Sequence, residues 1–282
     1  GGHAAHPARP PPAAHRALGR LLRRDRARLG EAALHTAQAN VLRDAKKKGR
    51  VTAATRAENE PKRIDPSSLT FTSAIAPAPS DRSRVITIVS GLPRSGTSMM
   101  MQMLAAGGIA PHTDAQREAD EDNPRGYFEH KQATELRSDA SWLPNARGKV
   151  VKIVAHLLPH LPPPQNGDEY RVVFMHRDLD EVIASQSAML ERLGRQGARL
   201  KAGQLSRVYS AQLVRVEEWL RRARGVATIG VRYADVIADP AATAERISKF
   251  VGQPFDAGQA AAAVDSSLWR QRSEVVTASS GS

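Results

Sequence analysis

The sequence predicts an α/β fold of three layers, α/β/α, in which a central parallel sheet is covered by helices on both faces. Short apolar runs rich in β-branched residues, typical of buried parallel strands, lie near Val85–Ser90, Val150–Val154, Tyr170–His176 and Ala227–Arg232. Helical segments separate or follow these runs, among them Met99–Ala106, Gln204–Ala223 and Ala241–Val251. A glycine-bounded loop follows the first run at once, as in open α/β sheets that bind phosphate at the ends of their strands.

The loop Gly91–Ser98 reads GLPRSGTS and has the frame of a phosphate-binding loop without its lysine. In P-loops that hydrolyse ATP or GTP, a lysine follows the second glycine, and Thr97 stands at that position here. A strand, a glycine-bounded turn and a helix N-terminus direct backbone N–H groups at one anion. We therefore expect a phosphate site, with Arg94 as its nearby cation, that is poorly suited to metal-assisted γ-phosphoryl transfer. The alternative is an ordinary strand-to-helix turn whose Gly, Pro and Ser serve geometry alone.

Within this loop, Pro93–Ser98 resembles the 5′-phosphosulfate loop of the sulfotransferases that use 3′-phosphoadenosine 5′-phosphosulfate (PAPS). That family also holds the 3′-phosphate of PAPS with an Arg at the end of a central strand and a Ser eight positions later. Arg177 and Ser185 have this spacing, and Arg177 directly follows the predicted strand Tyr170–His176. The resemblance implies a 3′-phosphate site at these two residues. It implies a 5′-phosphosulfate site at Arg94, Ser95, Gly96, Thr97 and Ser98.

A third element is similar to the same family. Tyr233 follows a predicted strand and is itself followed by Asp239, Pro240 and a closing amphipathic helix. In relatives the tyrosine touches the adenine, so the resemblance implies this role for Tyr233, whereas the alternative is a ring that packs at the end of a strand. The resemblance extends roughly from Val85 to Trp269.

Sulfuryl transfer needs a base for the acceptor proton and a cation for the charge that develops on the leaving nucleotide. Arg94 suits the second task. Asp114 and Glu129 rank together as the base. Asp114 lies near the sequence position at which protein-tyrosine sulfotransferases carry an acidic base. Glu129 ends the segment DNPRGYFE, which is similar to a segment of some bacterial sulfotransferases. The alternative for both is a solvent-facing carboxylate in an acidic loop.

A lysine and a histidine on the second predicted strand resemble another family pattern. Cytosolic sulfotransferases place a base in a Lys-x-His motif, but His156 lies two positions too late after Lys152. Lys152 is therefore the better match, as a cation near the transferred group. Without a P-loop lysine or a clear strand-borne Asp, we expect no metal ion.

Charge divides the chain into a basic N-terminal extension, residues 1–80, and a catalytic domain, residues 81–282. The whole chain has 41 Lys and Arg against 29 Asp and Glu, a net charge of +12. The first 80 residues carry +9 of this and the rest +3, so the charge does not mark the domain as a nucleic-acid binder. The extension is expected to be partly disordered and partly helical. It either packs on the domain as a solvated arm or binds an acidic partner or a membrane surface.

These observations favour a PAPS-dependent sulfotransferase that acts on a hydroxyl or amine of a small-molecule, glycan or peptide acceptor. The lack of cysteine suits a cytoplasmic enzyme. Two alternatives stay open: a nucleotide or small-metabolite kinase that uses ATP and magnesium, and a catalytically silent nucleotide-binding module. The sequence does not identify the acceptor, because acceptor pockets are built on variable loops.

Overall fold

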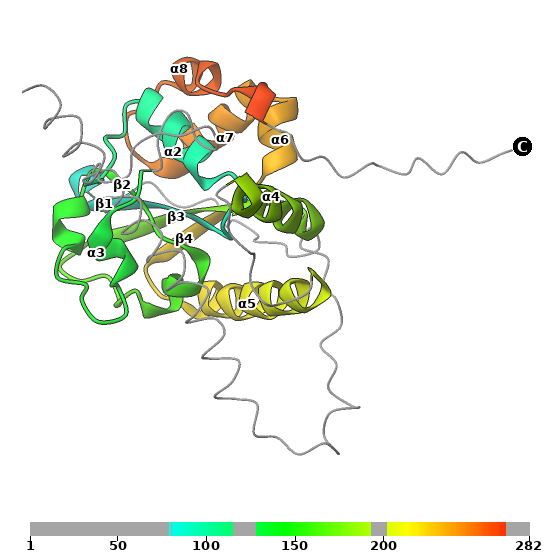
Figure 1. Ribbon diagram of the computed structural model, residues 1–282. Coiled ribbons are helices and arrows are strands. Elements are labelled where there is room, and N and C mark those ends of the chain that lie inside the picture. Colours follow the sequence, from blue (N-terminus) through cyan, green and yellow to red (C-terminus); the bar gives the residue numbers. More distant parts are fainter. Residues whose placement is uncertain (1–78, 80, 115–127, 193–201, 269–282) are drawn as a thin grey trace, which may run out of the picture.

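The computed structural model describes residues 79, 81–114, 128–192 and 202–268, so the N-terminal extension lies almost entirely outside it. In these residues, one parallel sheet has the strand order β2-β1-β3-β4 (Figure 1). The strands are β1 (Val85–Gly91), β2 (Val150–Lys152), β3 (Glu169–His176) and β4 (Val226–Arg232). The α/β fold and the four predicted strands are therefore confirmed.

Helices fill the connections between the strands and follow the last one. The α-helices are α2 (Thr97–Ala106), α3 (Lys131–Thr134), α4 (Leu179–Arg192), α5 (Ala202–Arg222), α6 (Tyr233–Ala238), α7 (Pro240–Val251) and α8 (Ala257–Ala262). Short 3₁₀ turns lie at Arg82–Arg84, Leu143–Ala146, Ala155–His160 and Ser266–Leu268. Among the described helices, none is both long and apolar enough to cross a membrane.

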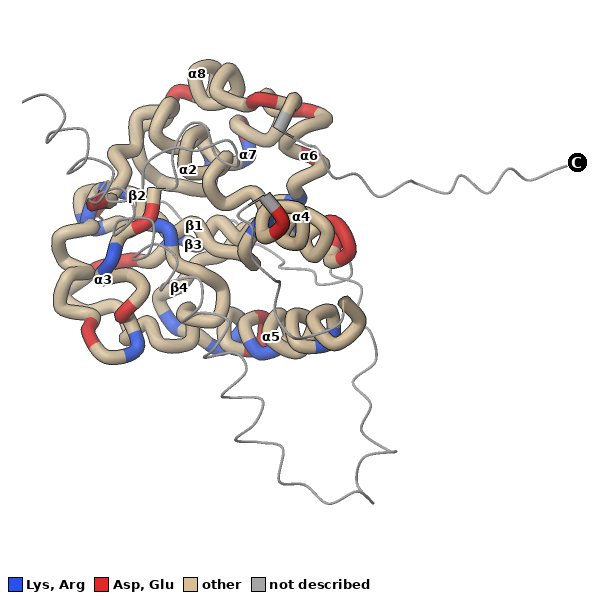
Figure 2. Tube along the Cα trace, viewed as in Figure 1, with Lys and Arg blue, Asp and Glu red and all other residues tan. Residues whose placement is uncertain are grey.

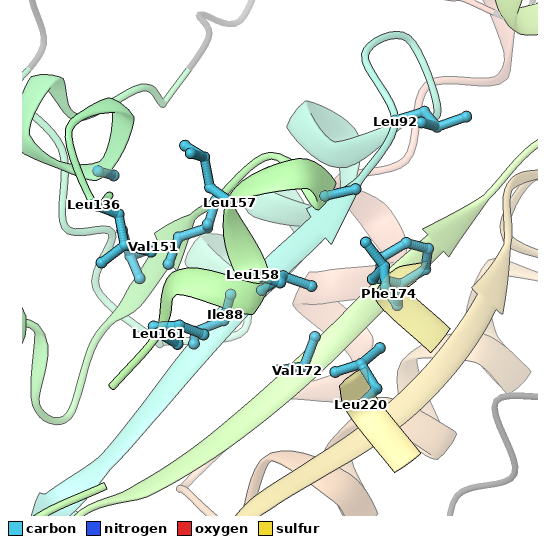
Figure 3. Packing of buried hydrophobic residues seen from close by; sticks show 14 of the residues in the cluster. Ile88, Leu92, Leu136, Val151, Leu157, Leu158, Leu161, Val172, Phe174 and Leu220 are labelled. Carbon is cyan, nitrogen blue, oxygen red and sulfur yellow. The ribbon is translucent and has the colours of Figure 1, made fainter. Parts of the chain in front are cut away.

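Two hydrophobic cores lie on opposite faces of the sheet and make the fold three-layered. Alternate residues of β1 and β3, such as Ile88 and Phe174, pack with α4, α5 and the 3₁₀ turn after β2 (Figure 3). Their neighbours Val89 and Val173 pack on the other face with α2, α6, α7 and α8. Because both faces are covered, the strands are apolar along nearly their whole length, which is why they could be recognised in the sequence.

Local chemistry sets the ends of α7, which covers the sheet late in the chain. Asp239 Oδ1 accepts a hydrogen bond of 2.8 Å from Ala242 N, and Pro240 occupies the first turn, where its missing N–H costs nothing. Gly252 ends the helix with φ +68°, a conformation that favours glycine.

The register of the sheet brings the three predicted motifs to one edge. Gly91 at the end of β1 pairs with Met175 of β3, and His176 of β3 pairs with Arg232 of β4. The residues that follow these strands therefore leave the sheet side by side at its carboxyl edge, where open α/β sheets bind ligands. Figure 2 shows residues of both charge signs spread over the described elements, in keeping with the small net charge of this part of the chain.

Candidate functional site

The loop after β1 has backbone angles that explain its glycines. Gly96 has φ +95°, and a Cβ at this position would collide with the ring of Tyr233. Arg94 also has a positive φ, 69°, which is uncommon for a residue with a side chain. The Ser95 N–H donates to Leu92 O at 3.1 Å and closes the turn. The loop is thus tightly folded against the start of α2, with N–H groups of the first turn of α2 at its mouth.

Two serine hydroxyls at this loop are buried with an unused hydrogen-bonding capacity. Ser95 is 1% exposed, and Ser90 at the end of β1 is fully buried. Neither Oγ has a hydrogen-bond partner among the described residues. Buried hydroxyls are nearly always partnered in folded proteins. A phosphate-type group in the loop would supply the missing acceptor, so the residues present fit such a ligand.

The predicted 5′ and 3′ phosphate residues come together. Arg94 Nε donates to Ser185 Oγ at 3.1 Å, which links the loop to α4. Arg177 Nη1 donates to the Arg94 carbonyl oxygen at 3.2 Å. These contacts join segments 91 and 83 positions apart in the chain. The structure therefore brings Arg94, Arg177 and Ser185 into one cluster.

Tyr233, the first residue of α6 directly after β4, packs against the same cluster. Arg177 Cζ lies 4.5 Å from the centroid of its ring, in the geometry of a cation–π contact, and Gly96 lies against the edge of the ring. The side chain is 5% exposed. Burial raises the pKa of Tyr233, and the positive charge of Arg177 opposes this rise. The predicted role of Tyr233 at an adenine stays a prediction, but its packing against both phosphate motifs is a direct observation.

One residue of this cluster was not anticipated from the sequence. Glu181 Oε2 accepts from Arg177 Nε at 2.8 Å, and each of the two side chains is 7% exposed. The spacing of four positions between an Arg and a Glu at the start of a helix is the signal that could have indicated this ion pair.

Lys152 contacts both Glu129 and the first turn of α2, the helix that follows the loop. Lys152 Nζ donates to Ser98 Oγ at 3.2 Å and lies 3.7 Å from Glu129 Oε1. The Lys152 side chain is 10% exposed and that of Glu129 is 31% exposed. Lys152 is thus held at the first turn of α2, with the partly exposed carboxylate of Glu129 beside it.

The residues on either side of segment 115–127 contact each other, and these contacts hold the backbone of Glu129 in place. Thr113 Oγ1 donates to the Glu129 carbonyl oxygen at 2.8 Å, and the His112 and His130 rings stack at 4.3 Å. Burial, together with the charge of His130, lowers the pKa of His112. Asp114 Oδ2 accepts from the Lys131 N–H at 2.7 Å and so holds the chain at the start of α3.

The remaining candidates occupy other places. His156 lies in the 3₁₀ turn Ala155–His160 after β2, because the strand ends at Lys152. The other acidic candidates, Glu118, Asp120, Glu121 and Asp122, lie outside the described residues. In the described part of the chain, no group of three or more His, Cys, Asp or Glu residues could hold a metal ion.

Comparison with known proteins gives one family match and several matching solved structures. Residues 168–257 match the model of the "Sulfotransferase family". This segment spans β3, α4, α5, β4, α6 and α7, with Arg177, Ser185 and Tyr233 among its residues. A search of curated proteins gave no match.

Three of the solved structures that match this chain are sulfotransferases or sulfotransferase domains of low sequence identity. The sulfotransferase domain from the curacin biosynthetic pathway is 15% identical, with a TM-score of 0.41 over 67% of this chain and 90% of that one. The sulfotransferase domain from the olefin synthase of Synechococcus PCC 7002 is 16% identical, with a TM-score of 0.40 over 70% and 91%. A sulfotransferase from Alicyclobacillus acidocaldarius is 16% identical, with a TM-score of 0.37 over 62% and 85%. The match of residues 168–257 to the sulfotransferase family agrees with the resemblance that the motifs indicate.

Proposed function

We propose that this protein transfers a sulfuryl group from PAPS to a hydroxyl or amine acceptor. The observation that carries the proposal is the convergence of Arg94, Ser185, Arg177 and Tyr233, which come from three separate strand ends. Two guanidinium groups at one strand edge suit a ligand with two separate phosphate groups.

The residues present fit a 3′,5′-phosphorylated adenosine. The unpartnered Ser95 hydroxyl and the N-terminus of α2 accommodate the 5′ end, and Arg177 with Ser185 accommodates the 3′-phosphate. When bound, PAPS supplies the sulfuryl group and a nucleotide leaving group. In ATP, which lacks a 3′-phosphate, Arg177 and Ser185 have no phosphate to hold.

Each residue then has a distinct chemical task. Arg94 and the loop N–H groups stabilise the negative charge that develops on the leaving phosphate. The Lys152 ammonium, held by Ser98, adds a positive charge next to the transferred group. Glu129 accepts the proton of the acceptor hydroxyl or amine, and its 31% exposure leaves room for that acceptor. Asp114 remains the second candidate for the base.

Ligand-induced stabilisation tests the choice of nucleotide. A ligand that binds only the folded state raises the free energy of unfolding by RT ln(1 + [L]/Kd), so melting temperatures report binding directly. We expect adenosine 3′,5′-bisphosphate (PAP) and PAPS to raise the melting temperature without magnesium. Equal stabilisation by ATP with magnesium, and none by PAP, would replace this proposal with the kinase function.

Turnover tests the transfer itself. Incubation with PAPS and a pool of phenols, alcohols, sugars and amines should release PAP, detected by chromatography. An Arg94→Ala variant should release far less PAP, whereas Arg221→Ala, which removes an exposed arginine paired with Glu217 on α5, should match the wild type. If the wild type binds PAP but releases none with any acceptor, the chain is a silent nucleotide-binding module.

A further inference from the structure

Arg177 is held by groups from three different elements. Its Nε donates to Glu181 on α4 at 2.8 Å, its Nη1 donates to the Arg94 carbonyl at 3.2 Å, and its Cζ lies 4.5 Å from the centroid of the Tyr233 ring. The side chains of Arg177 and Glu181 are nearly buried, at 7% exposure each. An arginine on the surface would sample many rotamers, but this one has a single defined orientation.

The start of α4 explains why Glu181 can hold it. Asp178 Oδ1 accepts from the N–H groups of Asp180 at 2.9 Å and Glu181 at 3.1 Å, so the first turn of α4 is capped and ordered. Asp178 and Glu181 have the spacing of a capping box, in which the glutamate turns back toward the helix start. Here the Glu181 carboxylate reaches back to Arg177, the residue just before the cap.

From this geometry we infer that Glu181 is a positioning residue for nucleotide recognition. It acts through Arg177: the carboxylate fixes the guanidinium in the orientation that receives a 3′-phosphate, and thereby sets the preference for 3′-phosphorylated nucleotides. Pre-organisation of this kind reduces the rotamer freedom that is lost when the ligand binds. The inference rests on the proposed function, because it assumes that Arg177 receives this phosphate.

The negative charge of Glu181 has two opposing effects on PAP affinity, orientation of Arg177 and repulsion of the phosphate, and the titration distinguishes between them. A carboxylate beside the site repels a phosphate dianion, so its removal would strengthen PAP binding if repulsion outweighed orientation. The buried Arg177 needs a partner, because an isolated charge away from water is costly. Three simultaneous contacts to one guanidinium indicate that orientation is the larger effect.

Calorimetric titration of PAP and adenosine 5′-phosphate (AMP) into matched variants tests the inference. In Glu181→Ala, we expect PAP affinity to fall about tenfold and AMP affinity to change less than about twofold, so the preference for PAP is largely lost. Glu181→Gln should lose about threefold in PAP affinity, because its amide oxygen can still accept from Arg177 Nε. The matched control is Glu217→Gln, which changes the same chemical group in an i,i+4 pair with the exposed Arg221 on α5 and should keep both affinities.

A purely structural role for Glu181 would give a different result. In that case Glu181→Ala would lower PAP affinity and AMP affinity equally. Unchanged or increased PAP affinity in Glu181→Ala would also overturn the inference. If Glu181→Ala does not fold, as judged by circular dichroism, the test uses Glu181→Gln, for which we expect a loss of about threefold in PAP affinity.

A double-variant comparison shows whether the effect passes through Arg177. In an Arg177→Ala background, where only the repulsion remains, Glu181→Gln should not lower PAP affinity, and a further loss there would contradict the inference. Failure of the proposed function has a separate signature: a wild type that binds AMP as tightly as PAP. That result would remove both proposals, whereas a wild type that prefers PAP together with an unaffected Glu181→Ala removes the positioning role alone.

Discussion

Arg94 and Ser185 are joined by a hydrogen bond of 3.1 Å although 91 positions separate them in the chain. The arginine belongs to the loop after β1, and the serine lies in the second turn of α4. A serine hydroxyl that accepts from an arginine keeps its own hydrogen for a further acceptor. Ser185 can therefore contact Arg94 and a phosphate oxygen together, which connects the two ends of the proposed nucleotide site.

Removal of this hydroxyl should weaken nucleotide binding. We expect Ser185→Ala to lower PAP affinity about three- to tenfold, since one hydrogen bond contributes about 0.5–1.5 kcal/mol. Calorimetry with PAP measures the effect. Ser187→Ala is the matched control, because Ser187 is exposed on the same helix two positions later. Equal affinities in both variants would exclude Ser185 from the phosphate site.

Arg171 should contribute to stability. It is 1% exposed near the start of β3, where its Nη1 donates to the carbonyl oxygen of Phe250 near the end of α7, and its Nη2 lies 3.3 Å from Glu169 Oε2. We expect Arg171→Met to lower the free energy of unfolding by about 1.5–3 kcal/mol, the range for a hydrogen bond from a charged group. Urea denaturation measures this loss. Arg221→Met, at an exposed arginine whose contact with Glu217 is 3.9 Å long, should change stability by less than about 0.5 kcal/mol, and a similar loss in both variants would contradict the prediction.

Much of the fold could be predicted because its strands are buried on both faces. The runs at Val85–Gly91 and Glu169–His176 are rich in apolar residues, so their boundaries differ by one residue from the prediction. Helix α2 begins at Thr97, two residues before the predicted start, because the loop ends at Gly96 with its positive φ. The meeting of Arg94 with Ser185 was foreseeable as well, since loops that follow parallel strands share one edge of the sheet.

The partners of the charged side chains could not be predicted. The sequence indicated Glu129 and Asp114 as equal candidates, but the contact with Lys152 and the bond to Lys131 N depend on how separate loops approach each other. The Glu181 carboxylate was overlooked because acidic residues are common at helix starts for reasons unrelated to function. Residues 1–78 lie outside the described part of the chain, so the predictions for the basic extension stay predictions.

His176 should make the protein less stable in mild acid. Burial lowers the pKa of His176 from 6.5 to about 4, so between these values the unfolded chain binds a proton that the folded chain does not. The contribution of the neutral His176 to the free energy of unfolding is fully present above about pH 6.5 and is lost as the pH falls toward about pH 4. Between about pH 7.5 and about pH 5 the loss should be about 2 kcal/mol, and His176→Gln should lack it. Urea denaturation at both pH values measures the difference, and equal pH dependence in both proteins would contradict the assignment.

Glu129 should be the base rather than Asp114. The Glu129 carboxylate is partly exposed beside Lys152, whereas the Asp114 carboxylate accepts a backbone hydrogen bond that an asparagine oxygen could also accept. We expect Glu129→Gln to lower the rate of PAP release about 10²–10⁴-fold, the range for loss of a general base, with PAP affinity unchanged. Asp114→Asn and His156→Gln should keep most of the activity.

The rate loss is specific to Glu129 only if other carboxylates of the same region behave differently. Glu135→Gln is the control, because Glu135 is an exposed carboxylate at the end of α3, a few residues after Glu129. It should match the wild type in rate and in PAP affinity. The pH profile adds a second readout: loss of a base should remove the acidic limb of kcat/KM in Glu129→Gln. If Asp114→Asn shows the large loss while Glu129→Gln retains turnover, the proton goes to Asp114. Glu129 then serves to hold Lys152 at Ser98, and its variant should raise KM more than it lowers kcat.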